Sequence, residues 1–138
     1  MDIVLLALAK SFFGQVHIVC NFLGLNDLDA VIRIEKENDH FGFLLDIVDT
    51  ELLEPNHSEN IEAVTAKIVE FMTDVYRFSK YNYAFCDHEA EIQYTPEKFK
   101  EIQTDKYSIV VAPSTDGQGR TLLNVMKSNW NIDGLTVR

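Results

Sequence analysis

The chain has 138 residues and a formal net charge of -10 at pH 7, from 22 acidic and 12 basic side chains. That length predicts one domain, which buries most of the surface that its unfolded chain exposes. The acidity argues against direct binding to nucleic acid or to an anionic membrane, because both need a basic protein surface. Metal ions, cationic small molecules and basic proteins remain as partners.

The start of the chain is apolar apart from Asp2, but it lacks the positive segment that opens a signal peptide. We expect it to be structural, and no apolar run reaches the length that spans a bilayer. The two cysteines, Cys20 and Cys86, lie far apart in apolar runs. Buried free thiols are the favoured interpretation, and a disulfide is the alternative. Free thiols suit a reducing environment, so we expect a cytoplasmic protein.

The first fifty residues favour strands. Residues 15–22 are apolar with β-branched side chains, and residues 24–27 have the composition of a turn. Residues 30–37 and 41–48 flank the polar segment 38–40, which predicts a hairpin. The second arm is apolar on both faces and therefore predicts a central strand that is covered on each side.

The strongest helical signal covers residues 59–80, where apolar side chains recur at steps of three and four. Ser58 is the expected N-cap of this helix, because its hydroxyl can accept a bond from a free backbone N–H. A short second helix is expected after Thr95, with Pro96 in its first turn.

The last third of the chain returns to strands. Residues 107–112 predict a strand that Pro113 ends, and residues 121–130 fit a helix or a strand. Residues 130–137 predict a short terminal hairpin. Together the elements predict a single α+β domain over residues 1–138, with a mostly antiparallel sheet that is covered by one long helix plus a short helix.

The residues that most suggest a function lie between positions 83 and 94. Read at strand period, Asp87, Glu89 and Glu91 project from one face, with roughly 6–7 Å between neighbours. Such a row repels itself unless a cation lies opposite, and the chain has no surplus of basic side chains. The row therefore indicates an outside cation, either a basic partner surface or a metal ion. A solvated face that prevents wrong edge pairing explains the row without any partner.

Aromatic side chains extend this candidate surface. Tyr83 and Phe85 would share the face of the carboxylates and anchor a protein partner, because rings carry much of the binding free energy at interfaces. The competing interpretation is that another element buries both rings. Glu35 and Glu37, on the first arm of the expected hairpin, form a second acidic patch. An alternative contact surface is the solvent face of the long helix, around Glu62, Glu70 and Asp74.

Two other classes of function remain as alternatives. A small metal-dependent hydrolase would use Asp87, His88 and Glu89, but strand alternation sends His88 away from the carboxylates and leaves the ligand set incomplete. A scaffold or oligomeric subunit would self-associate through the strand at 41–48 or through the hairpin of Trp130. No cofactor motif or nucleophile site stands out in the sequence. We therefore expect a binding protein that is not an enzyme and that uses no cofactor or metal.

Two segments, YAFCDHEAEIQYTPEKF at residues 83–99 and NWNIDGLTVR at residues 129–138, are similar to stretches of immunity family sixty-four from bacterial polymorphic-toxin systems. The likeness covers mainly residues 81–138. It implies a cytoplasmic antitoxin that binds and blocks a cognate toxin domain, often a nuclease, and it assigns no site residues. The charge of the chain fits such a partner independently, because the basic cleft of a nuclease accepts carboxylates.

Overall fold

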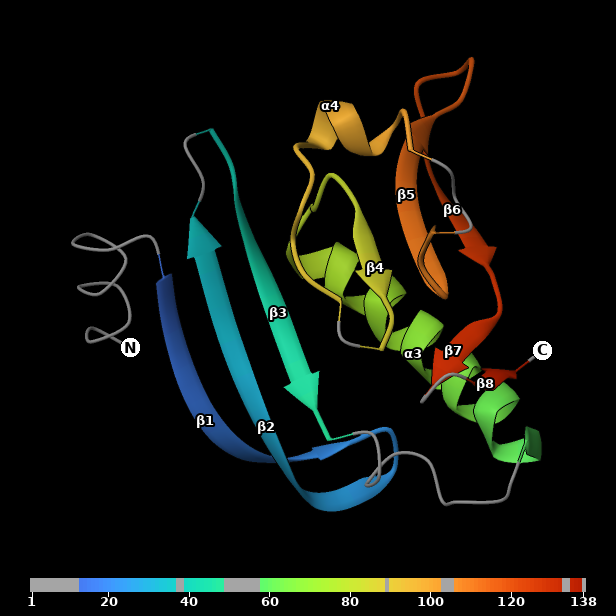
Figure 1. Ribbon diagram of the computed structural model, residues 1–138. Coiled ribbons are helices and arrows are strands. Elements are labelled where there is room, and N and C mark those ends of the chain that lie inside the picture. Colours follow the sequence, from blue (N-terminus) through green and yellow to red (C-terminus); the bar gives the residue numbers. More distant parts are fainter. Residues whose placement is uncertain are drawn as a thin grey trace. The chain divides into compact units, whose positions relative to one another are not determined.

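The computed structural model describes residues 13–36, 39–48, 58–88, 90–102, 106–132 and 135–137 (Figure 1). The chain divides into two compact units, one of residues 1–56 with 91–95 and one of residues 57–90 with 96–138. Helices and antiparallel strands occur together, so the predicted α+β class is confirmed. That both units form a single domain stays a prediction.

The first unit contains a three-stranded antiparallel sheet in the order β1-β2-β3. Its strands are β1 (Phe13–Phe22), β2 (Leu25–Lys36) and β3 (Phe41–Ile47). The predicted strands are therefore present, and β2 and β3 form the predicted hairpin. The turn between β1 and β2 is shorter than expected and lies at Leu23 and Gly24, with φ angles of 55° and 83°. Paired positive φ angles suit a tight hairpin, because they match the twist of the strands.

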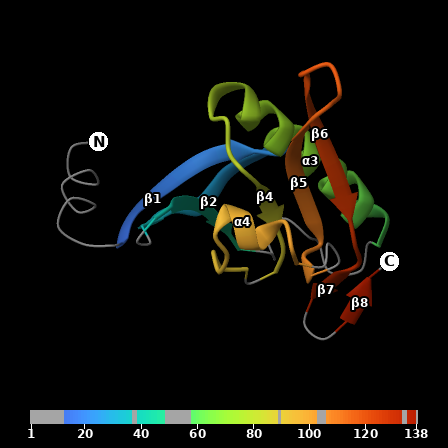
Figure 2. The same cartoon turned by 90° about the horizontal axis from the view of Figure 1, so that it is seen from above.

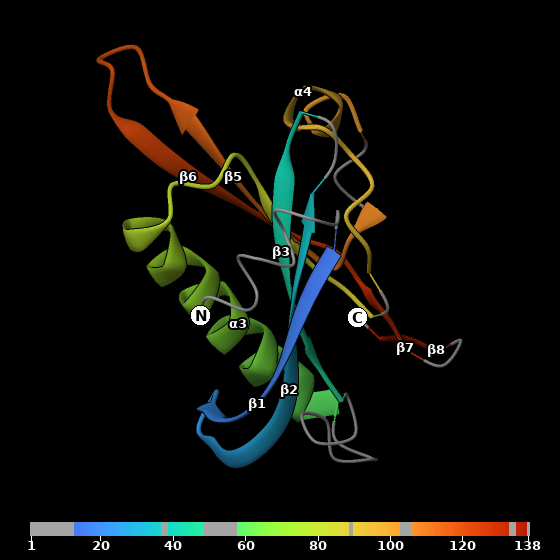
Figure 3. The same cartoon turned by 90° about the vertical axis from the view of Figure 1, so that its left-hand side faces the viewer.

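The hairpin of β1 and β2 curls near this turn (Figures 1 and 3). Its register shifts between Cys20 and Phe22, where the strand carries an irregularity. Beyond the turn, Asp27 has a φ of 56°, and its backbone N–H donates to Asn21 Oδ1 at 3.1 Å. Bulges of this kind bend a strand and increase its twist, which accounts for the curl.

The position of β3 differs from the prediction. Within the described residues, β3 pairs only with β2, so the central strand is β2 and the prediction of a central β3 is wrong. Phe41 is 65% exposed and Phe43 is 61% exposed, so one of its apolar faces is uncovered. Apolar residues at successive positions show what a strand can bury, and they do not fix its place in the sheet.

The second unit contains the long helix α3 (Ser58–Phe78), which has 21 residues and begins one residue before the predicted range. Its buried positions include Thr65, Ile68 and Met72, which follow the predicted three- and four-residue steps. Helix α3 packs against strand β5 of the same unit. The short helix α4 (Pro96–Phe99) lies where Thr95 and Pro96 predicted it.

The sheet of the second unit has the order β4-β5-β6, with β4 (Ala84–Cys86), β5 (Ile109–Thr115) and β6 (Thr121–Lys127). Strand β5 supplies the core, since the exposure of Ile109, Val110 and Val111 is 1% or less. Pro113 lies inside β5, opposite Leu123, so it does not end the strand. Pairing with β4 stops at Val111, so at Pro113 only β6 borders the strand and a missing N–H is tolerated.

The segment 121–130 was compatible with a helix or a strand in the sequence. Its residues 121–127 form strand β6. Strand β7 (Trp130–Ile132) follows soon after it and pairs with β8 (Leu135–Val137), as Figure 2 shows. This is the predicted terminal hairpin. Trp130 Nε1 donates to Thr65 Oγ1 of α3 at 2.9 Å, which ties the hairpin to the helix.

Candidate functional site

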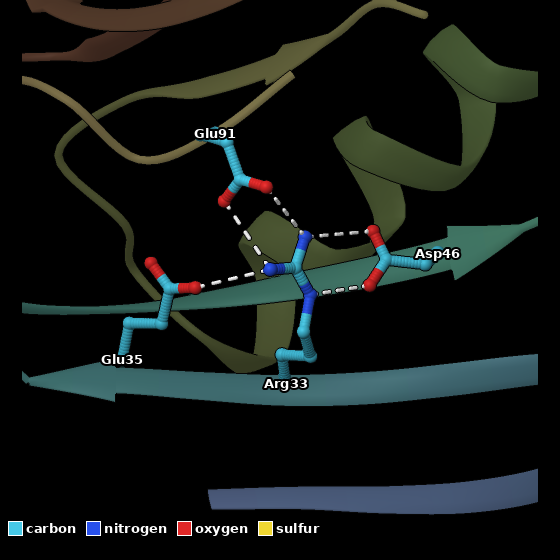
Figure 4. A network of polar contacts seen from close by, with 4 residues as sticks. All are labelled: Arg33, Glu35, Asp46 and Glu91. Carbon is cyan, nitrogen blue, oxygen red and sulfur yellow. Dashed lines mark hydrogen bonds and ion pairs between the residues drawn. The ribbon is translucent and has the colours of Figure 1, made fainter. Parts of the chain in front are cut away.

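Among the described residues of the first unit, the most highly charged contact surrounds Arg33 on β2 (Figure 4). Its guanidinium faces three carboxylates, each from a different part of the unit. Arg33 Nε donates to Asp46 Oδ2 at 2.5 Å and Nη2 donates to Asp46 Oδ1 at 3.1 Å. The two terminal nitrogens reach Glu91 at 3.2 and 3.3 Å, and Nη1 also reaches Glu35 at 3.2 Å. These four residues, Arg33, Glu35, Asp46 and Glu91, are the Arg33 cluster.

Strand geometry brings most of the Arg33 cluster together. Arg33 and Glu35 are two residues apart on β2 and therefore project from the same face. Asp46 pairs with Val31, so it lies diagonally across from Arg33 on the same face of the neighbouring strand. The third carboxylate, Glu91, lies far along the chain but belongs to the same unit.

A close packing contact places Glu91. The next residue, Ile92, lies over Gly42 of β3, and a Cβ atom on Gly42 would collide with Ile92 Cδ1. The missing side chain of Gly42 therefore makes room for the segment 91–95. That segment then presents the Glu91 carboxylate to Arg33, and both contacts fix it against β2 and β3.

The Arg33 cluster holds more carboxylates than cations. One guanidinium meets three carboxylates within it. The hydrogen bond from Arg33 to Asp46 raises the pKa of the guanidinium above its ordinary value, while partial burial opposes that rise. The bidentate contact to Asp46 also fixes the plane of the guanidinium.

The expected row of carboxylates is not formed. Strand β4 ends at Cys86, so Asp87 and Glu91 do not share one strand face, and the predicted strand through them is wrong. Asp87 turns toward its own unit, where it accepts bonds from Ser108 Oγ at 2.7 Å and from the backbone N–H of His88 at 2.9 Å. Glu89 lies outside the described residues, and Glu91 belongs to the other unit.

Tyr83 and Phe85 belong to a stack of four rings within the second unit. Tyr83 lies on Phe99 with a centroid distance of 3.7 Å, and Phe85 lies on Tyr107 at 4.5 Å. Phe99 and Tyr107 are buried, whereas Tyr83 and Phe85 are half-buried. Burial raises the pKa of Tyr83 above its ordinary value. The rings therefore pack against their own unit, which leaves only part of each for a partner.

The sequence profile of immunity protein 64 matches residues 2–138, nearly the whole chain. The chain belongs to the immunity protein 64 family. The resemblance found over residues 81–138 is thereby confirmed and extends to the first half. No curated protein and no solved structure matches the chain.

The other acidic residues of this immunity protein are dispersed. Glu35 belongs to the Arg33 cluster, and Glu37 lies outside the described residues. On α3, Glu62 and Glu70 are exposed, and Asp74 forms an exposed ion pair with Arg77 at 3.2 Å. On the helix surface Asp74 therefore meets one described cation, whereas three carboxylates meet at Arg33 in the Arg33 cluster.

Within the described residues, no group of three or more histidine, cysteine, aspartate or glutamate side chains is arranged to hold a metal ion. Both cysteines are free thiols. Burial, and secondarily the charge of Asp87, raises the pKa of Cys86 to about 12, so its thiol stays protonated near neutral pH. None of the helices in the described part of the chain is both long and apolar enough to cross a membrane.

Sequence reasoning did not identify Arg33 and Asp46 as candidate residues. A usable signal was present, because Arg33 and Glu35 alternate on one arm of the hairpin and Asp46 lies on the other. The net charge of -10 drew attention away from this signal, because it suggested that no basic side chain was available to pair with the carboxylates. The structure nevertheless has Arg33 in contact with three carboxylates.

Proposed function

We propose that this chain is an immunity protein that binds one cognate toxin domain and blocks it by occupying its surface, without catalysing a reaction. Membership of the immunity protein 64 family supports the binding role. The net charge of -10 supports a basic partner, because opposite charges speed the encounter of two proteins. We place the protein in the cytoplasm, where it meets the toxin before the toxin reaches its target.

The observation that carries the choice of surface is that Arg33 fixes two partly exposed carboxylates, those of Asp46 and Glu91. The side chains of Asp46 and Glu91 are 43% and 50% exposed, so their free lone pairs are accessible to a partner. A lysine or arginine of the toxin beside them would form ion pairs with these two carboxylates. Because Arg33 already fixes both carboxylates, Asp46 and Glu91 would lose little side-chain entropy when a partner binds them.

The remaining predicted contacts stay proposals. Glu91 and Glu35 enter the proposed surface through the Arg33 cluster. We keep five further residues as individual contacts and not as a row or a patch: Asp87, Glu89, Glu37, Tyr83 and Phe85.

We further propose that the toxin acts on a polyanion, as a nuclease does. Such an enzyme has a basic cleft, and an acidic surface can occupy it. The proposal predicts that heparin, a polyanion unrelated to either protein, competes with the immunity protein for the toxin. A toxin that binds the immunity protein equally well in the presence of heparin would contradict the nuclease class and leave the inhibitor role intact.

The surface is tested by the association rate with the cognate toxin domain. The double variant Asp46→Asn, Glu91→Gln removes two charges from the Arg33 cluster. The control Glu62→Gln, Glu70→Gln removes two exposed charges from α3. We expect the cluster variant to slow association by about three- to tenfold and the control to change it less than about twofold.

The outcomes distinguish a wrong choice of contact surface from a wrong assignment of the inhibitor function. Equal effects of both double variants would show that only the total charge matters and would contradict the Arg33 cluster as the contact. Absence of binding by the unsubstituted protein would contradict the inhibitor function itself. The effect should shrink as salt is added, because salt screens exposed charges.

A further inference from the structure

Strand β6 forms one edge of the sheet in the second unit (Figure 1). Among the described strands, it pairs with β5 and with no other strand. Five of its seven residues are exposed, including Leu122 at 49% and Val125 at 39%. The edge strand of a sheet presents a row of unpaired backbone N–H and C=O groups, which another strand can bind.

Hydrogen bonds at both ends of the β5–β6 pair show which residues of β6 carry these unpaired groups. Directly opposite residues of antiparallel strands alternate between pairs that exchange hydrogen bonds and pairs that do not. The N–H of Ser128 donates to the carbonyl of Ser108 at 2.9 Å, and the N–H of Asp116 donates to the carbonyl of Arg120 at 2.9 Å. The register is continuous between these two ends, so the even-numbered residues of β6 bond to β5.

The odd-numbered residues of β6 direct their N–H and C=O groups away from β5. These residues are Thr121, Leu123, Val125 and Lys127. Pro113 fits this alternation, because it lies opposite Leu123, where no bond between the two strands needs its missing N–H. The outer edge of β6 therefore offers four backbone N–H groups and four carbonyls at regular spacing.

Strand β6 lacks the usual protections of an edge strand. Natural edges carry prolines, bulges or several charges, or they are very short. Strand β6 has seven residues, no proline, no register shift against β5 and a single charged residue, Lys127 at its end. In contrast, β4 at the other edge of the same sheet has three residues. An open edge of this kind favours pairing with a further strand.

The sequence of β6 is complementary to itself in an antiparallel pair. A two-fold axis at Asn124 gives all seven residues of each copy a partner, whereas an axis at a neighbouring residue leaves some of them unpaired. The arrangement creates two kinds of apolar pair and one polar pair, and no like charges lie opposite each other. The opposite pairs, with one residue from each copy, are Leu123–Val125, Leu122–Met126 and Thr121–Lys127.

The local charge favours a second copy of this chain over the toxin. Residues 105–138, which contain β6, have three acidic and four basic side chains and therefore a net charge of +1. The other residues of the chain then carry a net charge of -11. A basic toxin is attracted to the acidic part of the chain, whereas two copies of a nearly neutral edge can approach each other with little repulsion.

We propose that two copies of this protein pair through β6 in an antiparallel arrangement, with the two-fold axis at Asn124. The pairing joins the two sheets into one continuous sheet of six strands, with the short β4 at each end. It satisfies the backbone groups of the outer edge and closes that edge against further copies. Each chain keeps its own Arg33 cluster in the first unit, so the proposed ratio stays one toxin domain per chain.

The register is tested by disulfide crosslinking of the full chain. In the proposed pair the two Asn124 residues lie directly opposite without exchanging backbone bonds, so their Cα atoms are about 4.5 Å apart. That distance lies within the range of a disulfide, and the variant Asn124→Cys should form covalent dimers under mild oxidation. Gly117→Cys is the matched control, because it adds one cysteine in the loop between β5 and β6, where a Cβ atom meets nothing within 4 Å.

The two Gly117 positions of the proposed dimer lie far apart. Arg120 is four residues from the axis, so its two copies are separated by about 26 Å, and the two loops lie beyond them. We expect Asn124→Cys to give at least about tenfold more covalent dimer than Gly117→Cys. Both variants retain the native Cys20 and Cys86, which contribute equally. Equal yields would indicate random collision and would contradict the register.

Amide hydrogen exchange followed by NMR tests the pairing without any substitution. In a monomer, the amides of Leu123 and Val125 face water and exchange quickly, whereas those of Leu122 and Asn124 are bonded to β5. The proposed dimer predicts slow exchange at all four positions in concentrated protein, and at least about tenfold faster exchange at Leu123 and Val125 on dilution. Protection of the two even-numbered amides alone at every concentration would contradict the proposal.

The mass in solution provides a third measurement. We expect a Kd of about 10 µM or less, which leaves most chains paired at about 100 µM. Light scattering should then give the mass of a dimer for the unsubstituted protein and of a monomer for Val125→Pro, which removes one outward N–H and keeps the bonds to β5. Val125→Ile is the control, because it keeps that N–H and should remain a dimer. Emission from Trp130, which is bonded to Thr65, checks that Val125→Pro remains folded.

Two further results would overturn the proposal and leave the inhibitor function intact. The first is the mass of a monomer for the unsubstituted protein in concentrated solution. The second is protection of the Leu123 and Val125 amides that appears only after the cognate toxin domain is added, which would assign the outer edge of β6 to the toxin.

Discussion

Arg33 and Asp46 form a two-point contact between β2 and β3, with Nε–Oδ2 and Nη2–Oδ1 distances of 2.5 and 3.1 Å. The contact is the centre of the Arg33 cluster, because the same guanidinium also holds Glu35 and Glu91. It joins two adjacent strands to a segment from far along the chain. Stability and the proposed binding surface therefore depend on the same arginine.

The variant Arg33→Gln removes the cation and leaves three carboxylates close together. We expect the free energy of unfolding to fall by about 1–3 kcal/mol, because charge repulsion replaces hydrogen-bonded ion pairs. Urea denaturation measures the change. Arg77→Gln is the control, since Arg77 forms an exposed pair with Asp74 and should cost less than about 0.5 kcal/mol. Equal losses in both variants would contradict a structural role for the Arg33 cluster.

The close contact of Gly42 and Ile92 predicts a coupled pair of substitutions. Gly42→Ala places a Cβ atom against Ile92 Cδ1 and should cost about 1–2 kcal/mol of unfolding free energy through overpacking. In an Ile92→Ala background the same change should cost much less, since the colliding atoms are gone. Gly117→Ala is the control, because a Cβ there meets nothing within 4 Å. Additive losses would show that the segment 91–95 does not rest on Gly42.

The bond from Trp130 to Thr65 predicts a specific effect of Thr65→Val. The hydroxyl of Thr65 accepts from the indole N–H at 2.9 Å and donates to the carbonyl of Ile61 at 2.7 Å. Its loss should lower the unfolding free energy by about 1–2 kcal/mol and change the emission of Trp130, the only tryptophan of the chain.

Thr73→Val is the matched control, because Thr73 makes the same bond to a backbone carbonyl of α3 without a tryptophan. We expect its cost to stay below about 0.5 kcal/mol. If both variants lost equal stability and left the emission of Trp130 unchanged, the hydrogen bond from Trp130 to Thr65 would not stabilise the protein.

The half-buried Cys86, whose thiol has a raised pKa, is expected to react slowly with thiol reagents and to make stability depend on pH. With its pKa raised to about 12, roughly one thiol in 10,000 is ionised at pH 8, so thiol reagents should modify Cys86 only after unfolding. The unfolded thiol ionises near its ordinary value of 9.0. Its contribution to stability is therefore complete below pH 9 and is lost as the pH rises toward 12.

Titration of free thiols against urea concentration measures this protection. The variant Cys86→Ser serves as the control, because it should lose the slowly reacting thiol and leave the reaction of Cys20 unchanged. Rapid modification of both cysteines in the folded protein would contradict the burial of Cys86.

Local periodicity predicted most of the elements. The steps of three and four residues located α3, and the polar break before Phe41 located the hairpin of β2 and β3. Both signals depend only on neighbouring residues, so they can be found in one sequence. The prediction that Pro113 ends its strand was wrong, because β5 continues through it to Thr115. Whether a strand tolerates a proline depends on whether a second strand lies beside that position.

The candidate site was harder to predict because its residues meet through long-range pairing. Alternation places Asp87 and Glu91 on one face only if the strand continues, and the sequence does not show that β4 ends at Cys86. The partner of Glu91 is 58 residues away, so no local pattern connects it with Arg33. Net charge likewise describes the whole chain and says nothing of individual pairs.

The most direct test of the proposed function titrates the activity of the cognate toxin domain with the immunity protein. Binding in a one-to-one complex predicts that activity falls in proportion to added protein, reaches zero at one equivalent and returns when high salt separates the two chains. Continued loss of activity at far less than one equivalent would indicate a catalytic antitoxin. Full activity at excess immunity protein would contradict the inhibitor altogether.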